Sequence, residues 1–163
     1  MKAFYLSLFA ALFALTVPSP ALAQGGTLDN PQLENARALI QATQEALIRN
    51  DLRLTEAEDA AFWPVWEEYR AATLPIRDRY VLLIAEYLRR YDAGTLDDAY
   101  AEEVLANYFD IKIGLLETRE SFIEKFAEVL PMLKVARLYQ LENKLTADVD
   151  AELALIVPLF DDR

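Results

Sequence analysis

Hydrophobic side chains recur at helical spacing along most of this 163-residue chain. From about residue 55 to 91 they alternate at steps of four and three, a heptad pattern that lasts for about four heptads. Its positions are Phe62, Trp66, Tyr69, Thr73, Ile76, Tyr80, Leu83 and Tyr87. A similar pattern follows from about residue 98 to 130, at Tyr100, Val104, Tyr108, Ile111, Leu115, Phe122, Phe126 and Val129. No strand pattern competes, so the sequence predicts an all-α fold.

The first of these segments has clear start and stop signals. Thr55 and Glu58 form a capping box, in which the threonine hydroxyl accepts from one free amide and the carboxylate accepts from another. Together with Leu54, they are interpreted as a helix cap. A glutamine at position 58 would fill the same box, so we expect Glu58→Gln to be nearly silent. The helix is expected to end near Tyr91, because Gly94 breaks the pattern.

The second segment is expected to open in the same way. The segment from Thr95 to Asp98 repeats the cap, with Asp in place of Glu, and the helix is predicted to run to about Leu130. A tight turn joins these two helices of roughly 35 residues, each about 50 Å long at 1.5 Å per residue. They must therefore pack antiparallel as a helical hairpin.

Two shorter helices flank the predicted hairpin. Pro31 follows a capping residue at Asp29 or Asn30, which predicts a helix to about residue 50. Pro131 ends the second long helix or starts the next one, which is extended to about residue 145 and on through residue 157. The sequence thus predicts about four helices.

Two prolines lie inside the first long helix. Pro64 and Pro75 each remove a backbone hydrogen bond and add a clash that costs about 3 kcal/mol unless the helix bends. This helix is therefore expected to be kinked or curved, and a curved hairpin has a concave side.

The N-terminus has the pattern of a secretory leader. Lys2 precedes an apolar stretch from Ala3 to Val17, and Ala21-Leu22-Ala23 is a small-residue cleavage signal. The stretch is shorter than the roughly 20 residues that span a bilayer. We expect residues 1–23 to be a cleaved signal peptide, residues 24–163 to be a single all-helical domain, and no membrane insertion after cleavage. Because the chain has no cysteine for disulfides, a bacterial periplasm is the expected location.

The composition removes most catalytic side chains. The chain has no histidine and no cysteine, and Ser121 is the only serine after the predicted leader. General bases near neutral pH are usually His, and activated nucleophiles are usually Ser, Cys or Lys beside such a base. We therefore expect no enzyme, no cofactor and no metal site, and a function carried by a surface. The alternative is an enzyme that uses carboxylates and tyrosine.

The charge narrows the range of partners. Without Lys2, 15 basic side chains face 27 acidic ones, which gives a net charge of −12. Such a field repels nucleic acid and anionic lipid headgroups, so neither is an expected partner. A cationic or net-basic partner, or loosely held divalent cations, would be compatible with it.

The hairpin carries many tyrosines, whose rings suit a surface that is partly wet and partly apolar. The candidate residues for binding a protein partner, here called a client, are Tyr69, Tyr80, Tyr87, Tyr91, Tyr100 and Tyr108. The alternative is that this aromatic stripe belongs to the core. The two heptad seams supply more apolar surface than a thin hairpin covers, which favours an antiparallel homodimer.

Two stretches of the chain are similar to a known family. The run Leu54-Thr55-Glu56-Ala57-Glu58, followed by Phe62-Trp63-Pro64-Val65-Trp66-Glu67-Glu68-Tyr69, resembles the Leu-Thr-x-x-Gln motif segment of the Spy/CpxP-like periplasmic proteins. The stretch from Val129 to Glu142 is similar to the place where relatives carry a second copy, with Leu130-Pro131-Met132 where a threonine cap would be expected. Position 58 is Glu rather than Gln.

The resemblance implies a small all-helical protein of the bacterial envelope. Members of that family are chaperones that bind non-native clients on a cradle-shaped dimer, adaptors that restrain an envelope-stress sensor kinase, or relatives linked to metal tolerance. The missing His and Cys ligands disfavour the metal role here. We expect a chaperone-like or envelope-stress protein that binds non-native proteins; the alternative is an adaptor for the periplasmic sensor domain of one signalling or metal-response protein.

Overall fold

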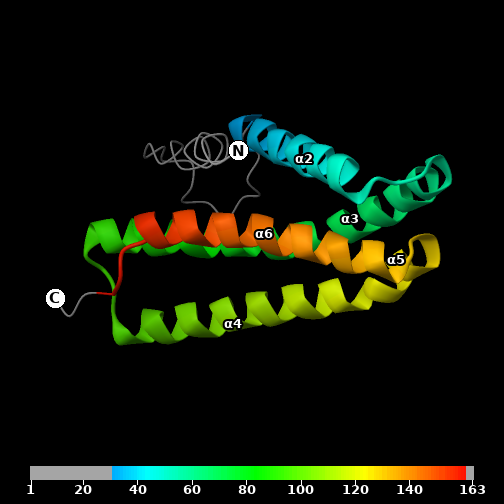
Figure 1. The fold of residues 1–163 in the computed structure, drawn as a ribbon. Helices are drawn as coiled ribbons and strands as arrows, with labels where there is room; N and C mark the ends of the chain where they lie inside the picture. Colours follow the sequence, from blue (N-terminus) through cyan, green and yellow to red (C-terminus); the bar gives the residue numbers. More distant parts are fainter. Residues whose placement is uncertain (1–30, 161–163) are drawn as a thin grey trace.

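The computed structural model describes residues 31–160, and the side chains of Ala38 and of residues 41–160. The predicted signal peptide and the predicted cap at Asp29 or Asn30 lie outside the described residues. Within them the chain forms helices and no strands, which confirms the predicted all-α fold (Figure 1). The helices are α2 (Pro31–Leu52), α3 (Glu56–Ala93), α4 (Asp98–Ser121), α5 (Ile123–Val129) and α6 (Met132–Ile156).

The ends of α3 are those that the sequence predicts. Thr55 Oγ1 accepts from the Glu58 amide at 3.3 Å, and Glu58 Oε2 accepts from the Thr55 amide at 2.7 Å, so both bonds of the capping box are present. At the other end Gly94 has a φ of 64°, which glycine adopts without a steric penalty. Its amide donates to the Tyr91 carbonyl and closes the helix.

The predicted cap of α4 is wrong by two residues. Asp97, not Thr95, is the N-cap, and its carboxylate accepts from the Tyr100 amide at 2.8 Å. The amide and the hydroxyl of Thr95 both donate to the Arg90 carbonyl instead. Thr95 therefore completes the end of α3, and the chain needs a second polar residue to start α4.

The long helix predicted to reach Leu130 is interrupted at Phe122. There the Phe122 amide donates to the Arg119 carbonyl, three residues back, and α5 begins at Ile123. Phe122 and Phe126 are four residues apart, so they share one side of the chain, and both are buried. The Phe122 ring lies 5.3 Å from that of Tyr69, measured between centroids. Burial of these rings offsets the interrupted hydrogen-bond ladder.

The helices α3 and α4 pack antiparallel as the predicted hairpin (Figure 1). α6 runs along this pair and contacts both helices through side chains. α2 packs against α6. The helix α3 bends near its beginning, and Pro64 and Pro75 both lie within it. None of the described helices contains a segment long and apolar enough to cross a membrane.

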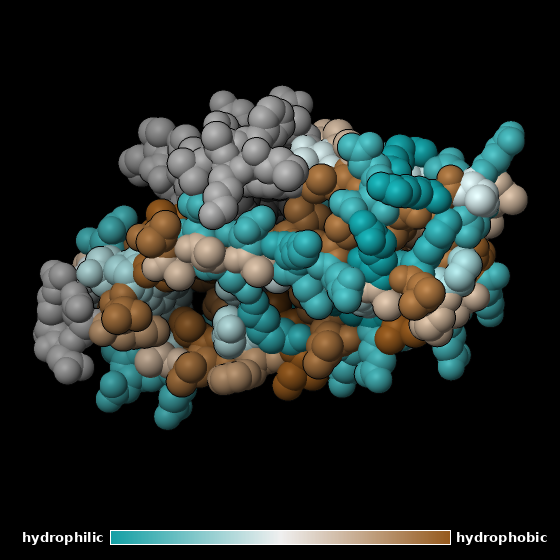
Figure 2. Space-filling model, viewed as in Figure 1, coloured by the Kyte–Doolittle hydropathy of each residue, from teal (hydrophilic) through white to brown (hydrophobic). Residues whose placement is uncertain are grey.

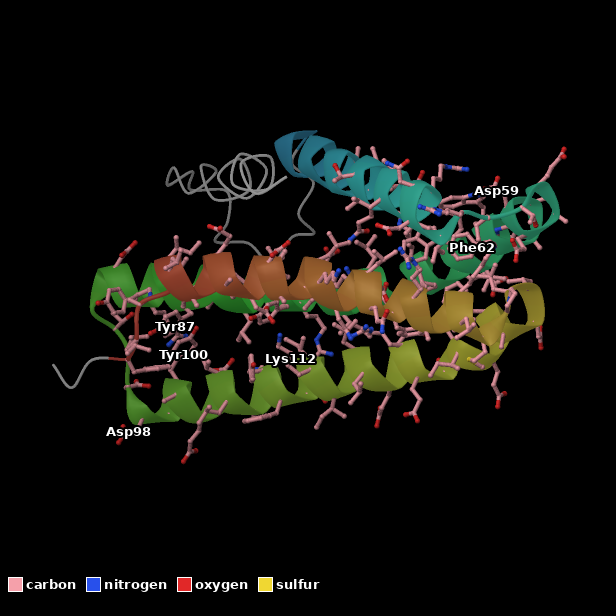
Figure 3. All side chains as sticks on the ribbon, in the orientation of Figure 1. Asp59, Phe62, Tyr87, Asp98, Tyr100 and Lys112 are labelled. Atoms are coloured by element: carbon pink, nitrogen blue, oxygen red, sulfur yellow. The ribbon has the colours of Figure 1, made fainter. Side chains whose placement is uncertain are left out.

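The hydrophobic core fills one half of the molecule, where α2, α3, α5 and α6 meet. Its rings are stacked: the Phe62 centroid lies 5.9 Å from that of Trp66 and 5.7 Å from that of Phe126. Phe62 and Tyr87 lie toward opposite ends of α3 (Figure 3). Among the described helices, α3, α4 and the end of α6 surround the half that contains Tyr87, and here the packing leaves a groove.

Candidate functional site: a tyrosine groove

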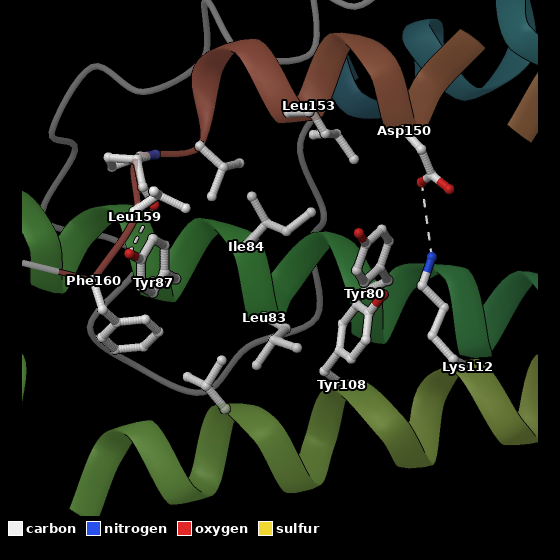
Figure 4. Close-up of a pocket in the computed structure, with 14 residues that line it drawn as sticks. Tyr80, Leu83, Ile84, Tyr87, Tyr108, Lys112, Asp150, Leu153, Leu159 and Phe160 are labelled. Atoms are coloured by element: carbon white, nitrogen blue, oxygen red, sulfur yellow. Dashed lines mark hydrogen bonds and ion pairs between the residues drawn. The ribbon is translucent and has the colours of Figure 1, made fainter. Parts of the chain in front are cut away.

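A cavity of about 510 Å³ opens between α3, α4 and the end of α6 (Figure 4). Its α3 wall contains Tyr80, Leu83, Ile84 and Tyr87, and its α4 wall includes Tyr108. Among the lining residues only Lys112 and Asp150 are charged. We call this cavity the tyrosine groove. An apolar cavity with a few polar groups is the usual form of a binding site.

Helical periodicity brings these side chains together. Tyr80, Ile84 and Tyr87 follow one another at steps of four and three, so they share one side of α3. On α4, Tyr108 and Lys112 are four residues apart. Because the two helices are antiparallel, Tyr80 meets Tyr108, with ring centroids 6.2 Å apart. The apolar heptad positions therefore pack in the core along one half of the hairpin and line the tyrosine groove along the other half.

One end of the tyrosine groove is polar. The Lys112 ammonium lies 4.6 Å from the Tyr80 ring centroid and 5.5 Å from that of Tyr108. Its nitrogen is 3.7 Å from Asp150 Oδ1. Both ring faces and the carboxylate attract the cation and fix its position. Burial, and then the negative charge of Asp150, raise the pKa of Tyr80, so this phenol stays neutral at physiological pH.

The other end of the groove is closed by the chain itself. The segment from Val157 to Phe160, which we call the tail, leaves α6 and turns toward α3 (Figure 4). The Tyr87 hydroxyl donates to the Pro158 carbonyl at 2.8 Å. The edge of the Phe160 ring packs on Tyr87, with centroids 4.9 Å apart. The sequence reasoning had no signal for this contact, because the tail follows the last helix and has no periodicity.

Four of the six tyrosines predicted to bind clients lie in or beside the tyrosine groove. Tyr80, Tyr87 and Tyr108 line it. Tyr91 lies next to Tyr87, with ring centroids 6.3 Å apart.

The other two predicted tyrosines are packed inside the protein. Tyr69 is 1% exposed and belongs to the hydrophobic core, so a client cannot reach it in this structure. Tyr100 is buried as well, and the Arg90 guanidinium lies 4.1 Å from its ring centroid. The core alternative therefore describes Tyr69 and Tyr100 better than the client-binding one. Heptad spacing identifies the apolar side of a helix but not which positions a neighbouring helix covers.

A buried polar cluster surrounds Glu142, which is 7% exposed. The Tyr69 hydroxyl donates to its carboxylate at 2.7 Å, Arg77 Nη2 lies 3.3 Å from Oε1, and Arg119 Nε lies 3.7 Å from Oε2. Burial and the negative charge of Glu142 raise the pKa of Tyr69, so the phenol remains a hydrogen-bond donor. The cluster ties α3, α4 and α6 together, which is a structural role.

Sequence reasoning missed this cluster, although a signal was present. Glu142 follows Val135 and Leu138 at steps of three and four, which places a carboxylate on the apolar side of α6. A buried charge on such a side requires partners. The pattern indicates that Glu142 needs charged or polar partners, but it does not identify Arg77 and Arg119, because both lie on other helices.

The predicted cap residues also have a tertiary role. Lys134 Nζ lies 2.6 Å from Glu58 Oε2 and donates to the Arg53 carbonyl at 3.0 Å. The hydrogen bonds from Lys134 and from the Thr55 amide lower the pKa of Glu58 to about 2. Leu54 packs against the core. These residues join the start of α6 to the start of α3, and nothing in their geometry points to a ligand.

Within residues 31–160, no three acidic side chains converge in an arrangement that could hold a metal ion. Comparison of the chain with protein-family models, with curated proteins and with solved structures finds no match. The tyrosine groove is therefore the feature of the described residues whose chemistry bears on function.

Proposed function

We propose that this chain is a periplasmic, ATP-independent chaperone-like or envelope-stress protein that binds non-native proteins in the tyrosine groove. The observation that carries the proposal is the apolar lining of a cavity of about 510 Å³, with three tyrosines and one fixed ion pair. The proposed activity needs neither a nucleophile nor a general base.

The lining suits reversible binding of varied apolar segments. A tyrosine ring offers a large apolar surface, and its hydroxyl can pair with the main chain of a bound segment. Exposed apolar segments are what distinguishes a non-native protein from a folded one. The chain is acidic, with a net charge of −11 over all 163 residues, which keeps such a surface soluble and attracts clients of positive charge.

One observation favours the alternative, an adaptor for the periplasmic sensor domain of a single signalling protein. Leu105, Phe109, Ile113 and Leu116 form an apolar stripe along α4, and each is more than half exposed. Figure 2 shows hydrophobic side chains along the lower edge of the molecule, where α4 lies in Figure 1. A rigid helical stripe matches a folded partner better than an unfolded chain. We call these four residues the α4 stripe.

The proposal is tested by suppression of the aggregation of a chemically denatured protein without ATP. The wild-type chain should slow aggregation, and Leu83→Asn, which places an amide in the groove lining, should remove most of the effect. The matched control is Leu82→Asn, because Leu82 is exposed and does not line the groove. No suppression by the wild-type chain, together with saturable binding to one sensor domain, would support the adaptor instead.

A further inference from the structure

The tail is an extended peptide that lies against the tyrosine groove. Pro158 has no amide hydrogen and disfavours helical geometry at the preceding residue, so Val157 adopts φ −84° and ψ 113°. The helix therefore ends at Ile156, and the four residues from Val157 to Phe160 all line the groove.

The contacts of the tail are those that a separate peptide would make. A main-chain carbonyl, that of Pro158, accepts from the Tyr87 hydroxyl, and such a bond does not depend on the side chain of the residue that accepts it. The Phe160 ring packs by its edge on the Tyr87 ring, which is a favourable aromatic geometry. Both contacts would be available to any extended segment with an aromatic residue two positions after the hydrogen-bonded carbonyl.

The tail is held at the surface of the groove and not within the core. Leu159 is 85% exposed, and Phe160 is about half exposed. A segment with so few buried apolar contacts is among the parts of a protein that open at low free-energy cost. Displacement of the tail would enlarge the accessible part of the groove without disturbing the core around Phe62 and Phe126.

We infer that the tail is an internal ligand of the tyrosine groove, and that clients are extended apolar segments that displace it. The inference rests on the proposed function and names the class of client: an unfolded segment with an aromatic residue near an accepting carbonyl. A tethered ligand acts at an effective concentration on the order of mM. Segments that bind no better than the tail then displace it only when their own concentration approaches this value, which sets a threshold for client binding.

The displacement can be observed directly in the full chain. The chain has no cysteine, so Leu159→Cys gives a single site for a nitroxide label at an exposed position of the tail. The probe is a synthetic peptide amide, Ile-Val-Pro-Leu-Phe. As peptide is added, the electron paramagnetic resonance spectrum should change from restricted to fast motion. The control label is Leu133→Cys, at an exposed position in the first turn of α6, whose spectrum should not change.

Removal of the tail should increase affinity for the same peptide. A chain that ends at Ile156, and the full-length variant Phe160→Asp, should both bind this peptide about tenfold more tightly than the wild type, as expected if the tail is closed about nine-tenths of the time. The Leu83→Asn substitution should abolish this binding in each background. If the shortened chain fails to fold, the peptide affinity of Phe160→Asp is compared with that of the wild type instead.

The outcomes separate this inference from the proposed function. An unchanged tail label and equal peptide affinity in all chains would overturn the inference, even if the wild-type protein suppresses aggregation. Peptide binding with release of the tail would support the inference even if no form suppresses aggregation, and the chaperone proposal would then be wrong.

Discussion

The carboxylate of Glu142 is the shared partner of three side chains on other helices. Its carboxylate is desolvated, and Tyr69, Arg77 and Arg119 compensate for the lost water. A buried charge pair of this kind adds little stability compared with apolar packing, but removing one partner leaves the others unpaired. Glu142 is therefore more sensitive to substitution than the acidic residues on the surface.

We expect Glu142→Leu to reduce the free energy of unfolding by about 3 kcal/mol, because it leaves two guanidinium groups without their carboxylate. Arg77 is partly exposed, which keeps the cost below that of a fully buried pair. The measurement is equilibrium denaturation by urea. The control is Glu67→Leu, an exposed residue paired with Arg70 on the same helix, where the loss should stay below about 0.5 kcal/mol. Equal effects of the two substitutions would contradict the buried cluster.

Glu58 gives a prediction on pH. Its pKa falls from 4.5 to about 2 in the folded protein, because Lys134 and the Thr55 amide stabilise the carboxylate. A lowered pKa in the folded state contributes stability that is present above pH 4.5 and is lost as the pH falls toward 2. The Tm of Glu58→Gln should therefore be below that of the wild type at pH 6, and the difference should vanish near pH 2. Glu56→Gln, in the same turn, is the control.

This outcome would differ from the one that the sequence alone predicts. The capping box suggests that Glu58→Gln is nearly silent, since glutamine can fill the same box. The prediction did not include Lys134, which is 76 residues away along the chain. A Tm of Glu58→Gln equal to that of the wild type at every pH would show that the ion pair contributes nothing.

At the level of the helix, the cap of α4 can be tested with a matched pair. Asp97→Ala removes the acceptor of the Tyr100 amide and should cost about 1 kcal/mol. Thr95→Ala removes only a long hydrogen bond to the Arg90 carbonyl and should cost a few tenths of a kcal/mol. Urea denaturation of both variants gives the comparison. A larger loss of stability for Thr95→Ala than for Asp97→Ala would indicate that Thr95 is the cap.

The helices differ in how well the sequence predicts them. Both ends of α3 follow from local chemistry, because Thr55 with Glu58 and Gly94 act within one turn of the helix end. The break at Phe122 has no such local signal. At the break Phe122 and Phe126 pack on Tyr69, a residue more than 50 positions earlier, and this contact is specified only by the tertiary structure.

The tyrosine groove could be predicted in part for the same reason. Heptad spacing places Tyr69, Tyr80 and Tyr87 on one side of α3. The fold then decides their roles: α5 and α6 bury Tyr69, whereas the same side near Tyr80 remains open. The tail was beyond prediction, because its four residues carry no period that relates them to Tyr87.

For the whole molecule, the α4 stripe bears on the predicted antiparallel homodimer. Four exposed apolar side chains on one helix are a surface that a second copy can cover. If the stripe is the dimer interface, Phe109→Glu should give a monomer at micromolar concentration by sedimentation, with helical content unchanged. The control is Leu133→Glu, which is exposed on α6, away from the stripe. A wild-type monomer would exclude the dimer and leave the stripe for a different partner.

If the chain binds non-native proteins as proposed, its net charge, −11 over all 163 residues, should make the choice of client depend on salt. Negative charge over the surface should attract basic clients and repel acidic ones, and this selectivity should weaken as the screening length falls to about 3 Å near 1 M salt. Binding in the tyrosine groove depends on apolar burial, which high salt does not remove.

An aggregation assay should therefore compare a basic and an acidic client of similar size, each at low and at high salt. We expect stronger suppression for the basic client at low salt and similar suppression of both at high salt. Equal suppression at every salt concentration would leave the chaperone proposal standing and contradict its electrostatic part.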